Sequence, residues 1–261
     1  MTTSMIRLAA LPVRHAVVPL WRLFLLATLA LAPPAAALSQ ETSRYSRAPE
    51  SPDGIGKVYM GREIARVMGW QGAAWLNRAE RAREERPDLL LAALELKPGM
   101  SVADVGAGTG YYSAPMAKAV APGGRVYAVD VQPQMLALIK KRMASEAIDN
   151  IVPVLGANDD VRLAPNSIDL ALLVDTYHEL DAPYEVMASL VRALKPGGRL
   201  VLVEYRAEDP AVPIKPLHKM SEAQVKRELD VLPLRHERTD NRLPWQHLVV
   251  FRRLDVKPGK P

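Results

Sequence analysis

Three glycines occupy alternate positions, Gly106, Gly108 and Gly110, between the apolar stretch Ser101–Val105 and a helical pattern. Glycine lets a backbone turn tightly and approach a ligand without a side chain in between, and a helix that begins there offers free N–H groups. The third glycine follows the second by two residues, whereas the dinucleotide fingerprint needs three, and no Lys-Ser or Lys-Thr pair completes a P-loop. The loop predicts a nucleotide-like ligand, and Asp104 just before it favours this over the alternative, an ordinary strand-to-helix turn.

A carboxylate ends the next apolar run, where Asp130 follows Arg125–Val129. In a doubly wound fold the tip of the strand beside the glycine loop lies near the ribose of a bound nucleotide, and a carboxylate accepts hydrogen bonds from both ribose hydroxyls. Asp130 comes 24 residues after Gly106, against about 20 in the dinucleotide rule. We therefore expect Asp130 to bind a ribose; a solvated aspartate at the end of a strand is the alternative.

Polar residues that could act on a substrate follow the fourth apolar run, Ile168–Val174. They lie at the sheet edge where ligands bind in this architecture. The candidate catalytic residues are Tyr177, His178 and Glu179. His178 is the best candidate for a general base because the pKa of an unperturbed histidine is near neutrality. The alternative is a helix start, capped by Asp175 or Asp181, in which His178 only packs.

The composition excludes several kinds of chemistry. The chain has no cysteine and therefore no disulfide, thiolate zinc site, iron–sulfur cluster or cysteine nucleophile. Its five histidines show no HxxxH or HExxH spacing, so we expect no metal. The net charge is +5, of which Arg7, Arg14 and Arg22 supply +3 in an N-terminal stretch without acids. The remaining residues are nearly neutral, which argues against a nucleic-acid partner.

Short apolar and β-branched runs alternate with helical patterns through the middle of the chain. The expected strands are 101–105, 125–129, 151–155, 168–174, 199–203, 231–238 and 246–253. The expected helices in this part are 112–120, 134–144, 184–194 and 221–229, the last one opened by a capping box at Ser221. Strands joined by crossover helices form a parallel, doubly wound sheet. We therefore expect an α/β fold with a Rossmann-like, seven-stranded mixed sheet and helices on both faces.

The expected segments are a signal peptide (1–37), a flexible linker (38–56), an N-terminal helical cap (57–98) and the α/β domain (99–261). Basic residues, the apolar run Leu23–Ala32 and small residues up to Ala37 are typical of a signal peptide, which implies export to the periplasm or out of the cell. The alternatives are an uncleaved membrane anchor, a mitochondrial transit peptide, or a wrongly assigned upstream start codon, in which case the cell does not translate this segment. Within the cap, apolar spacing predicts helix over 62–76, or two short helices because Gly69 and Gly72 weaken its centre. A solvated charged turn or helix is expected over 79–86, and a helix over 89–96 capped by Asp88.

Four segments in this order, Val102–Gly110, Val126–Asp130, Ile168–Leu180 and Leu194–Val203, resemble the motifs of the class I S-adenosylmethionine-dependent methyltransferases. The resemblance covers about residues 89–251. It implies that family's seven-stranded sheet with a final antiparallel strand, a methyltransferase domain over 99–261, and S-adenosylmethionine as the cofactor.

The resemblance also implies cofactor contacts. The three glycines would lie under the methionine part of S-adenosylmethionine, with Asp104 oriented toward its ammonium group. Many members place an acid and a small residue beside the adenine, where this chain has Gly156-Ala-Asn-Asp-Asp160. The remaining candidates are Asp130 for the ribose, Val131 over the adenine, Asn158 or Asp159 for the adenine amino group, and Asp175.

These observations together predict methyl transfer to a small-molecule acceptor. The alternative is an exported, non-catalytic ligand-binding or scaffold protein that retains the fold, because the donor is made in the cytosol and an exported enzyme would need a supply of it. A methyltransferase of protein or nucleic acid is a third hypothesis, which the near-neutral body weakens. The N-terminal segment could associate with a membrane, and the sequence leaves the oligomeric state open.

Overall fold

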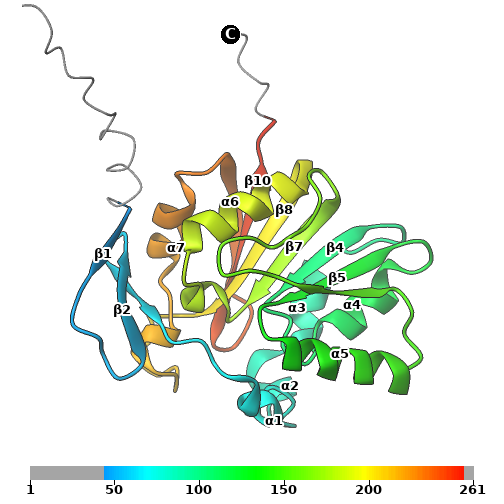
Figure 1. The fold of residues 1–261 in the computed structure, drawn as a ribbon, viewed down its shortest axis with the longest axis horizontal. Coiled ribbons are helices and arrows are strands. Elements are labelled where there is room, and N and C mark those ends of the chain that lie inside the picture. The colour runs from blue at the N-terminus through cyan, green and yellow to red at the C-terminus, as the bar shows by residue number, and fades with distance from the viewer. Residues whose placement is uncertain (1–43, 256–261) are drawn as a thin grey trace, which may run out of the picture. The chain divides into compact units, whose positions relative to one another are not determined.

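The computed structural model describes residues 44–255 of the chain. Seven strands form one mixed sheet in the spatial order β6-β5-β4-β7-β8-β10-β9 (Figure 1). Their bounds are β4 Ser101–Val105, β5 Arg125–Asp130, β6 Ile151–Leu155, β7 Ile168–Val174, β8 Leu194–Tyr205, β9 Leu234–Asp240 and β10 Gln246–Arg253. Strands β6, β5, β4, β7 and β8 are parallel, and β10 is antiparallel to both of its neighbours. The predicted α/β fold with a seven-stranded mixed sheet and an antiparallel last strand is confirmed.

Helices cover both faces of this sheet (Figure 1). Three of them pack on one face, α3 Pro87–Ala93, α4 Ser113–Val120 and α5 Pro133–Ser145. Two pack on the other, α6 Pro183–Ala193 and α7 Glu222–Leu229. Successive side chains of a strand point to opposite faces, so β7 supplies Leu170 and Leu172 to one core and Ala171 and Leu173 to the other. A strand buried on both faces has a continuous apolar sequence, which explains why β7 was recognisable.

Of the predicted capping box before α7, the N-cap hydrogen bond is present, whereas the Gln224 side chain contacts Met60, Arg227 and Glu228 instead of the Ser221 backbone. The Ser221 hydroxyl accepts a hydrogen bond from the backbone N–H of Gln224 at 3.1 Å, which satisfies one of the free donors of the first helical turn. The strand expected over 231–238 begins and ends later, as β9, because Leu232–Pro233 form part of the turn that follows α7.

The segment before residue 66 differs from the sequence-based expectation. Strands β1 Tyr45–Arg47, β2 Gly54–Tyr59 and β3 Arg62–Ala65 form an antiparallel sheet. The flexible linker predicted over 38–56 is therefore wrong for the residues that the structure describes, and so is the helix predicted from Arg62. Met60 and Gly61, both with positive φ, make the two-residue turn between β2 and β3. The common Asn-Gly or Asp-Gly signal for such a turn is missing, which is why the hairpin was not predicted.

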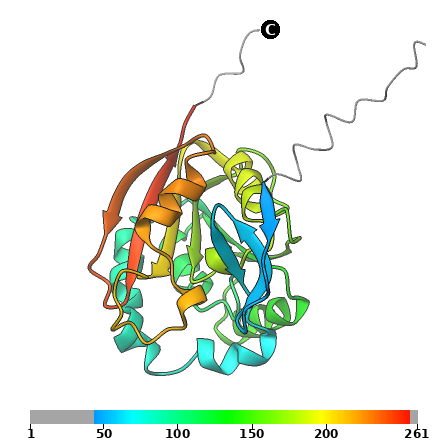
Figure 2. The ribbon, with the colours of Figure 1, turned by 90° about the vertical axis from the view of Figure 1, so that its left-hand side faces the viewer.

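Long-range contacts hold this small sheet to the helices α6 and α7. The Arg62 guanidinium makes a two-pronged ion pair with Glu228 on α7, at 2.8 and 2.9 Å. The Tyr45 hydroxyl donates a hydrogen bond to Glu185 on α6 at 2.5 Å. Figure 2 shows the small sheet, in blue, beside the orange helix α7.

Only short helices form in the rest of the predicted helical cap. They are a 3-10 turn η1 Trp70–Gly72, then α1 Ala73–Leu76 and α2 Arg81–Glu85, ahead of α3. The segment 79–86 was predicted to be solvated, but Arg81 and Glu85 are buried because they pair with each other at 2.7 Å. The predicted cap at Asp88 is also wrong, since Asp88 pairs with the Arg86 side chain and α3 already begins at Pro87.

The predicted signal peptide, residues 1–37, lies outside the described residues. Within residues 44–255 no helix combines the length and the apolar character needed to cross a bilayer.

Candidate functional site

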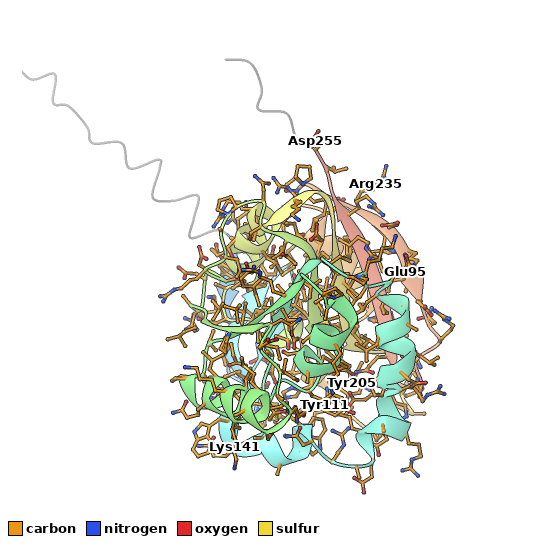
Figure 3. All side chains as sticks on the ribbon, turned by 90° about the vertical axis from the view of Figure 1, so that its right-hand side faces the viewer. Glu95, Tyr111, Lys141, Tyr205, Arg235 and Asp255 are labelled. Carbon is orange, nitrogen blue, oxygen red and sulfur yellow. The ribbon has the colours of Figure 1, made fainter. Side chains whose placement is uncertain are left out.

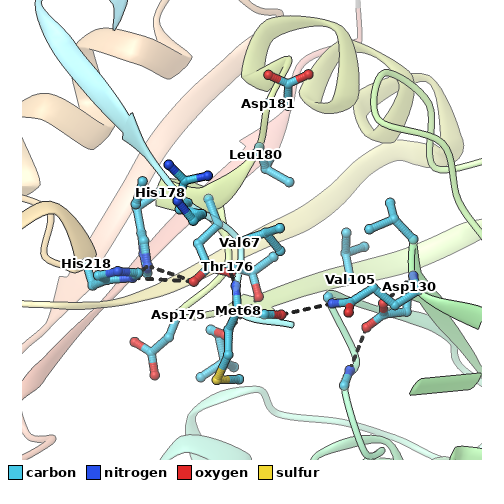
Figure 4. A pocket seen from close by; sticks show the side chains of 18 of the residues that line it. Val67, Met68, Val105, Asp130, Asp175, Thr176, His178, Leu180, Asp181 and His218 are labelled. Carbon is cyan, nitrogen blue, oxygen red and sulfur yellow. Dashed lines mark hydrogen bonds and ion pairs between the residues drawn. The ribbon is translucent and has the colours of Figure 1, made fainter. Parts of the chain in front are cut away.

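A cavity of about 930 Å³ opens at the carboxyl ends of the parallel strands. Each of these strands contributes a residue at or just after its end: Gly106 (β4), Asp130 (β5), Gly156 (β6), Asp175 (β7) and Tyr205 (β8). Figure 4 shows Asp130 at one end of the cavity, and His178 with His218 at the other. The sheet therefore collects side chains that are far apart in the chain, as ligand sites of parallel sheets do.

Most of the residues predicted from the sequence line this cavity. They are Gly106, Gly108, Asp130, Val131, Asn158, Asp175, His178 and Glu179. Four predicted residues do not line it: Asp104, Gly110, Tyr177 and Asp159.

The glycine loop and Asp130 form one hydrogen-bonded unit. The Asp130 carboxylate accepts a hydrogen bond from the backbone N–H of Gly108 at 2.9 Å and another from that of Gln132 at 2.8 Å. Gly106 and Gly108 have positive φ, and a Cβ on Gly106 would overlap with the Thr176 side chain. Only glycine gives this loop its close approach to the cavity. Burial raises the pKa of Asp130 above its ordinary value, whereas the backbone N–H groups lower it.

The predicted residues outside the cavity have local structural contacts. Asp104 accepts a hydrogen bond from the Ser113 hydroxyl of α4 at 2.5 Å, and burial raises its pKa to about 6. Gly110 lets α5 pack closely, because a Cβ there would lie 3.2 Å from Ile139 Cγ1. Asp159 is exposed to solvent, next to Asn158, which does line the cavity.

A buried cation that the sequence pattern does not indicate, Arg81, lies beside the glycine loop. Arg81 lines the cavity and donates to Glu85 at 2.7 Å, while the Tyr205 hydroxyl donates to the other Glu85 oxygen at 3.1 Å. The Arg81 guanidinium also lies 4.3 Å from the centre of the Tyr111 ring; Figure 3 labels both tyrosines. No local motif marks this site, because a helix of alternating charges is usually solvated.

Asp175 carries an unused acceptor at the same end of the cavity. One carboxylate oxygen, Oδ2, accepts from the Gln246 amide at 2.7 Å, and the other, Oδ1, is buried without a hydrogen-bond partner among the described residues. Burial raises the pKa of Asp175 well above its ordinary value, and the nearby carboxylates of Glu85 and Glu204 raise it further. A buried oxygen without a donor favours a ligand that brings one.

His178 belongs to a cluster at the opposite end of the cavity. Its Nδ1 lies 2.6 Å from Glu204 Oε2, and its Nε2 lies 3.2 Å from Nδ1 of His218, at the end of the 3-10 turn η3 Pro216–His218. Burial opposes protonation of His178, but the Glu204 carboxylate outweighs burial and raises the pKa. Sequence analysis did not include Glu204 or His218 among the site residues, because they lie 26 and 40 positions from His178.

Tyr177 and Glu179 flank His178 in the 3-10 turn η2 Tyr177–Glu179 and point to different surroundings. Tyr177 is fully buried in the apolar core between the sheet and α6, away from the cavity. Its backbone N–H donates to Glu204 at 2.9 Å. Glu179 lines the cavity and accepts a hydrogen bond from the backbone N–H of Met68 at 3.2 Å.

The segment after β3 covers the cavity. Val67, Met68, Trp75 and Leu76 line it from this side. Gln132 fastens the cover to the end of β5, since its side chain accepts from the backbone N–H of Trp70 at 2.7 Å and donates to the Met68 carbonyl at 3.0 Å. The N-terminal segment is thus part of the site, although its strands were not predicted.

Comparison with known proteins identifies the part of the chain that carries this site. Residues 103–202 match the family described as methyltransferase domain. Protein-L-isoaspartate O-methyltransferase from Aeropyrum pernix is 34% identical over 116 residues, which are 43% of this chain and 42% of that protein. Demethylmenaquinone methyltransferase from Halalkalibacterium halodurans is 27% identical over 121 residues, 46% of this chain and 49% of that protein. The match thus spans less than half of the length of each of these two relatives.

A solved structure extends the similarity beyond the matched domain. The crystal structure of a SAM-dependent methyltransferase from Aquifex aeolicus gives a TM-score of 0.67 at 26% identity, and the match covers 71% of this chain and 99% of that one. The residues matched by the family include the end of β4 before the glycine loop and the strand β5, which ends at Asp130. Residues 103–202 are thus similar to a methyltransferase domain, and the fold that surrounds them is shared with a SAM-dependent methyltransferase.

Proposed function

We propose that the protein binds S-adenosylmethionine at the glycine-loop end of the cavity and transfers its methyl group to a small molecule at the His178 end. The observation that carries this proposal is the buried carboxylate of Asp130, which is fixed to the glycine loop of a methyltransferase domain.

The nucleoside half of the cofactor suits the Asp130 end. Each carboxylate oxygen already accepts one backbone N–H, and each has a further lone pair for a ribose hydroxyl. Val131 follows directly and is 42% exposed at the cavity, where its apolar side chain can cover an adenine ring. Asn158, across the same end, has both a donor and an acceptor for the edge of the base.

The amino-acid half suits the pair of charges beside the glycine loop. Asp175 Oδ1 lacks a hydrogen-bond donor, which an ammonium group would supply. An ammonium at this position would also favour the ionised form of Asp175, whose pKa is raised in its absence. Arg81 lines the same end and could pair with the carboxylate of the ligand.

When bound, S-adenosylmethionine supplies an electrophilic methyl group on a sulfonium. Residues at the other end can then position an acceptor and hold its proton. His178 Nδ1 is oriented by Glu204 at 2.6 Å, so Nε2 faces the cavity as a base. Positioning in line with the methyl group supplies much of the rate in such a transfer.

The size and cover of the cavity favour a small acceptor. About 930 Å³ lies near the upper end of the range of ~300–1,000 Å³ for small-molecule sites, so the cavity accommodates a cofactor and a compact second ligand. Residues Met68, Trp75 and Leu76 narrow one side of this space, which favours a compact acceptor.

The test is calorimetric titration of S-adenosylmethionine into the full chain and its Asp130→Ala variant. Loss of two charge-assisted hydrogen bonds, each about 1.5–3 kcal/mol, should weaken binding by roughly 100-fold or more. Asp149→Ala, on an exposed loop, is the matched control and should bind like the unaltered protein. Equal affinity of the Asp130→Ala variant, with its fold verified by circular dichroism, would contradict the proposed ribose contact. An unaltered chain that does not bind would contradict the function itself.

A further inference from the structure

We propose that His178, Glu179 and His218 form a zinc site at the acceptor end of the cavity. Their atoms His178 Nε2, Glu179 Oε1 and His218 Nδ1 form a triangle with sides of 3.2, 3.4 and 3.8 Å. All three lie within 4.8 Å of one another and can each supply one ligand atom. The sequence predicted no metal because the two histidines lie 40 positions apart, and only the fold brings them together.

The dimensions of this triangle suit a four-coordinate zinc ion. The point equidistant from the three atoms lies about 2.0 Å from each, compared with bond lengths of about 2.0–2.1 Å for zinc to histidine and 2.0–2.2 Å for zinc to carboxylate. The average side, about 3.5 Å, is close to the separation of ~3.4 Å between neighbouring ligands of a tetrahedron with such bonds.

Groups behind two of the ligands, His178 and Glu179, hold them in orientation. Glu204 Oε2 lies 2.6 Å from His178 Nδ1, which forms the carboxylate–histidine pair that supports metal ligands in proteins. The other Glu204 oxygen accepts from the backbone N–H of Tyr177 at 2.9 Å, so the carboxylate is itself fixed. Glu179 is held through its second oxygen by the backbone N–H of Met68, which leaves Oε1 toward the histidines. This supporting set is a second observation, independent of the triangle.

The donor set selects the type of ion and its role. Two imidazoles and one carboxylate are a common ligand set of catalytic zinc, which keeps a fourth position for water or substrate. All three residues line the cavity, so the fourth position faces the space proposed for the acceptor. Calcium and magnesium prefer sites made of oxygen ligands and suit this set poorly.

The free fourth position of the zinc ion suits an acceptor that binds through a hydroxyl or thiol group, written here as X–H, where X is oxygen or sulfur. This role, unlike the binding of the ion, rests on the function proposed above. Ligation to zinc lowers the pKa of the bound X–H group, and its proton leaves to water. The new X–CH₃ bond then forms from the lone pair of X, while the pair of the broken S–CH₃ bond stays on sulfur, which becomes a neutral thioether. With zinc bound, Nε2 of His178 is a ligand and no longer acts as the base described above, and the proton is lost from the bound acceptor.

The test measures zinc on the full, untagged chain after chelator treatment and dialysis. Titration with zinc sulfate should give one equivalent by calorimetry and by elemental analysis, and Co²⁺ should give the visible spectrum of a tetrahedral site. His218→Ala and Glu179→Gln remove ligands whose side chains are 22% and 14% exposed, so these variants should fold and lose the equivalent. Glu204→Gln should weaken zinc binding by about 10–100-fold. His236→Ala, at the strand β9, is the matched control and should bind one zinc.

Either of two results would overturn the site: an unaltered chain that binds no zinc, or an equivalent that survives both ligand substitutions. Parallel titration with S-adenosylmethionine separates this proposal from the one before it. Cofactor binding without zinc binding would overturn the zinc site alone. Zinc binding without cofactor binding would support the site and overturn its role in methyl transfer.

Discussion

Replacing Asp104 with asparagine is expected to remove a pH dependence of stability that this one carboxyl group causes. Asp104 is only 3% exposed, below the glycine loop. Burial raises its pKa to about 6, and Asp130 acts in the same direction. The Ser113 hydroxyl, which donates to Asp104, and the Arg81 cation act in the opposite direction. Because the pKa of the folded protein exceeds the ordinary value of 3.8, folding strengthens the binding of this proton.

The size of the effect follows from these two values. The stabilisation from the Asp104 proton is complete below pH 3.8 and is lost as pH rises through about 6. The difference between the two values, at about 1.4 kcal/mol per pH unit, corresponds to about 3 kcal/mol. Asparagine can still accept the Ser113 hydrogen bond and never ionises. The variant should therefore gain about 2.4 kcal/mol of this total relative to the unaltered protein between pH 4 and pH 7.

Urea unfolding of both proteins, at several pH values between 4 and 7, measures this difference directly. All other groups titrate in both proteins, so subtraction isolates Asp104. Ser113→Ala removes a hydrogen bond that favours the ionised form, and should steepen the pH dependence rather than remove it. A difference between Asp104→Asn and the unaltered protein that stays constant with pH would refute the reasoning, and so would one that decreases toward pH 7.

Two further substitutions test the glycine loop and the attachment of the small sheet. Gly106→Ala should cost about 1–2 kcal/mol of stability because of the positive φ at this position, and it should also abolish cofactor binding because its Cβ would overlap with Thr176. Gly197 has almost the same φ but lies in open space, so Gly197→Ala should lose stability without affecting cofactor binding. Thermal unfolding measures the first effect, and calorimetric titration measures the second. Arg62→Leu should cost about 3–5 kcal/mol because it leaves Glu228 buried without its partner, and a second substitution, Glu228→Leu, should restore most of the loss in urea unfolding. A double variant as unstable as Arg62→Leu would contradict the second expectation.

Much of the large sheet could be predicted because its signals are local. The strand β7 is apolar except for Asp169, and β4 runs directly into the glycine loop. Ser221 and Gln224 cap a helix through a bond across three residues. In each case the residues that decide the structure are neighbours in the chain, and hydrogen-bond geometry over a few residues fixes the outcome.

Elements without a strong local signal were predicted incorrectly. The hairpin of β2 and β3 turns at Met60-Gly61, which lacks the usual turn residues, and Arg62 belongs to the sheet because Glu228 on α7 pairs with it. Arg81 and Glu85 have the composition of a solvated helix, yet they are buried because each neutralises the other. A local sequence pattern does not show which oppositely charged residue will pair with a buried charge.

Local sequence patterns are enough to predict a doubly wound sheet with a glycine loop and an acid at the end of the next strand. Which polar residues share the cavity can be seen only from the folded chain. His178, Glu204 and His218 come from the end of β7, the end of β8 and a loop beyond it. Their meeting depends on the order of strands in the sheet and on the path of a proline-rich loop. The strand order and the path of this loop depend on the packing of the whole chain, because contacts between distant segments form only when the helices pack on both faces of the sheet.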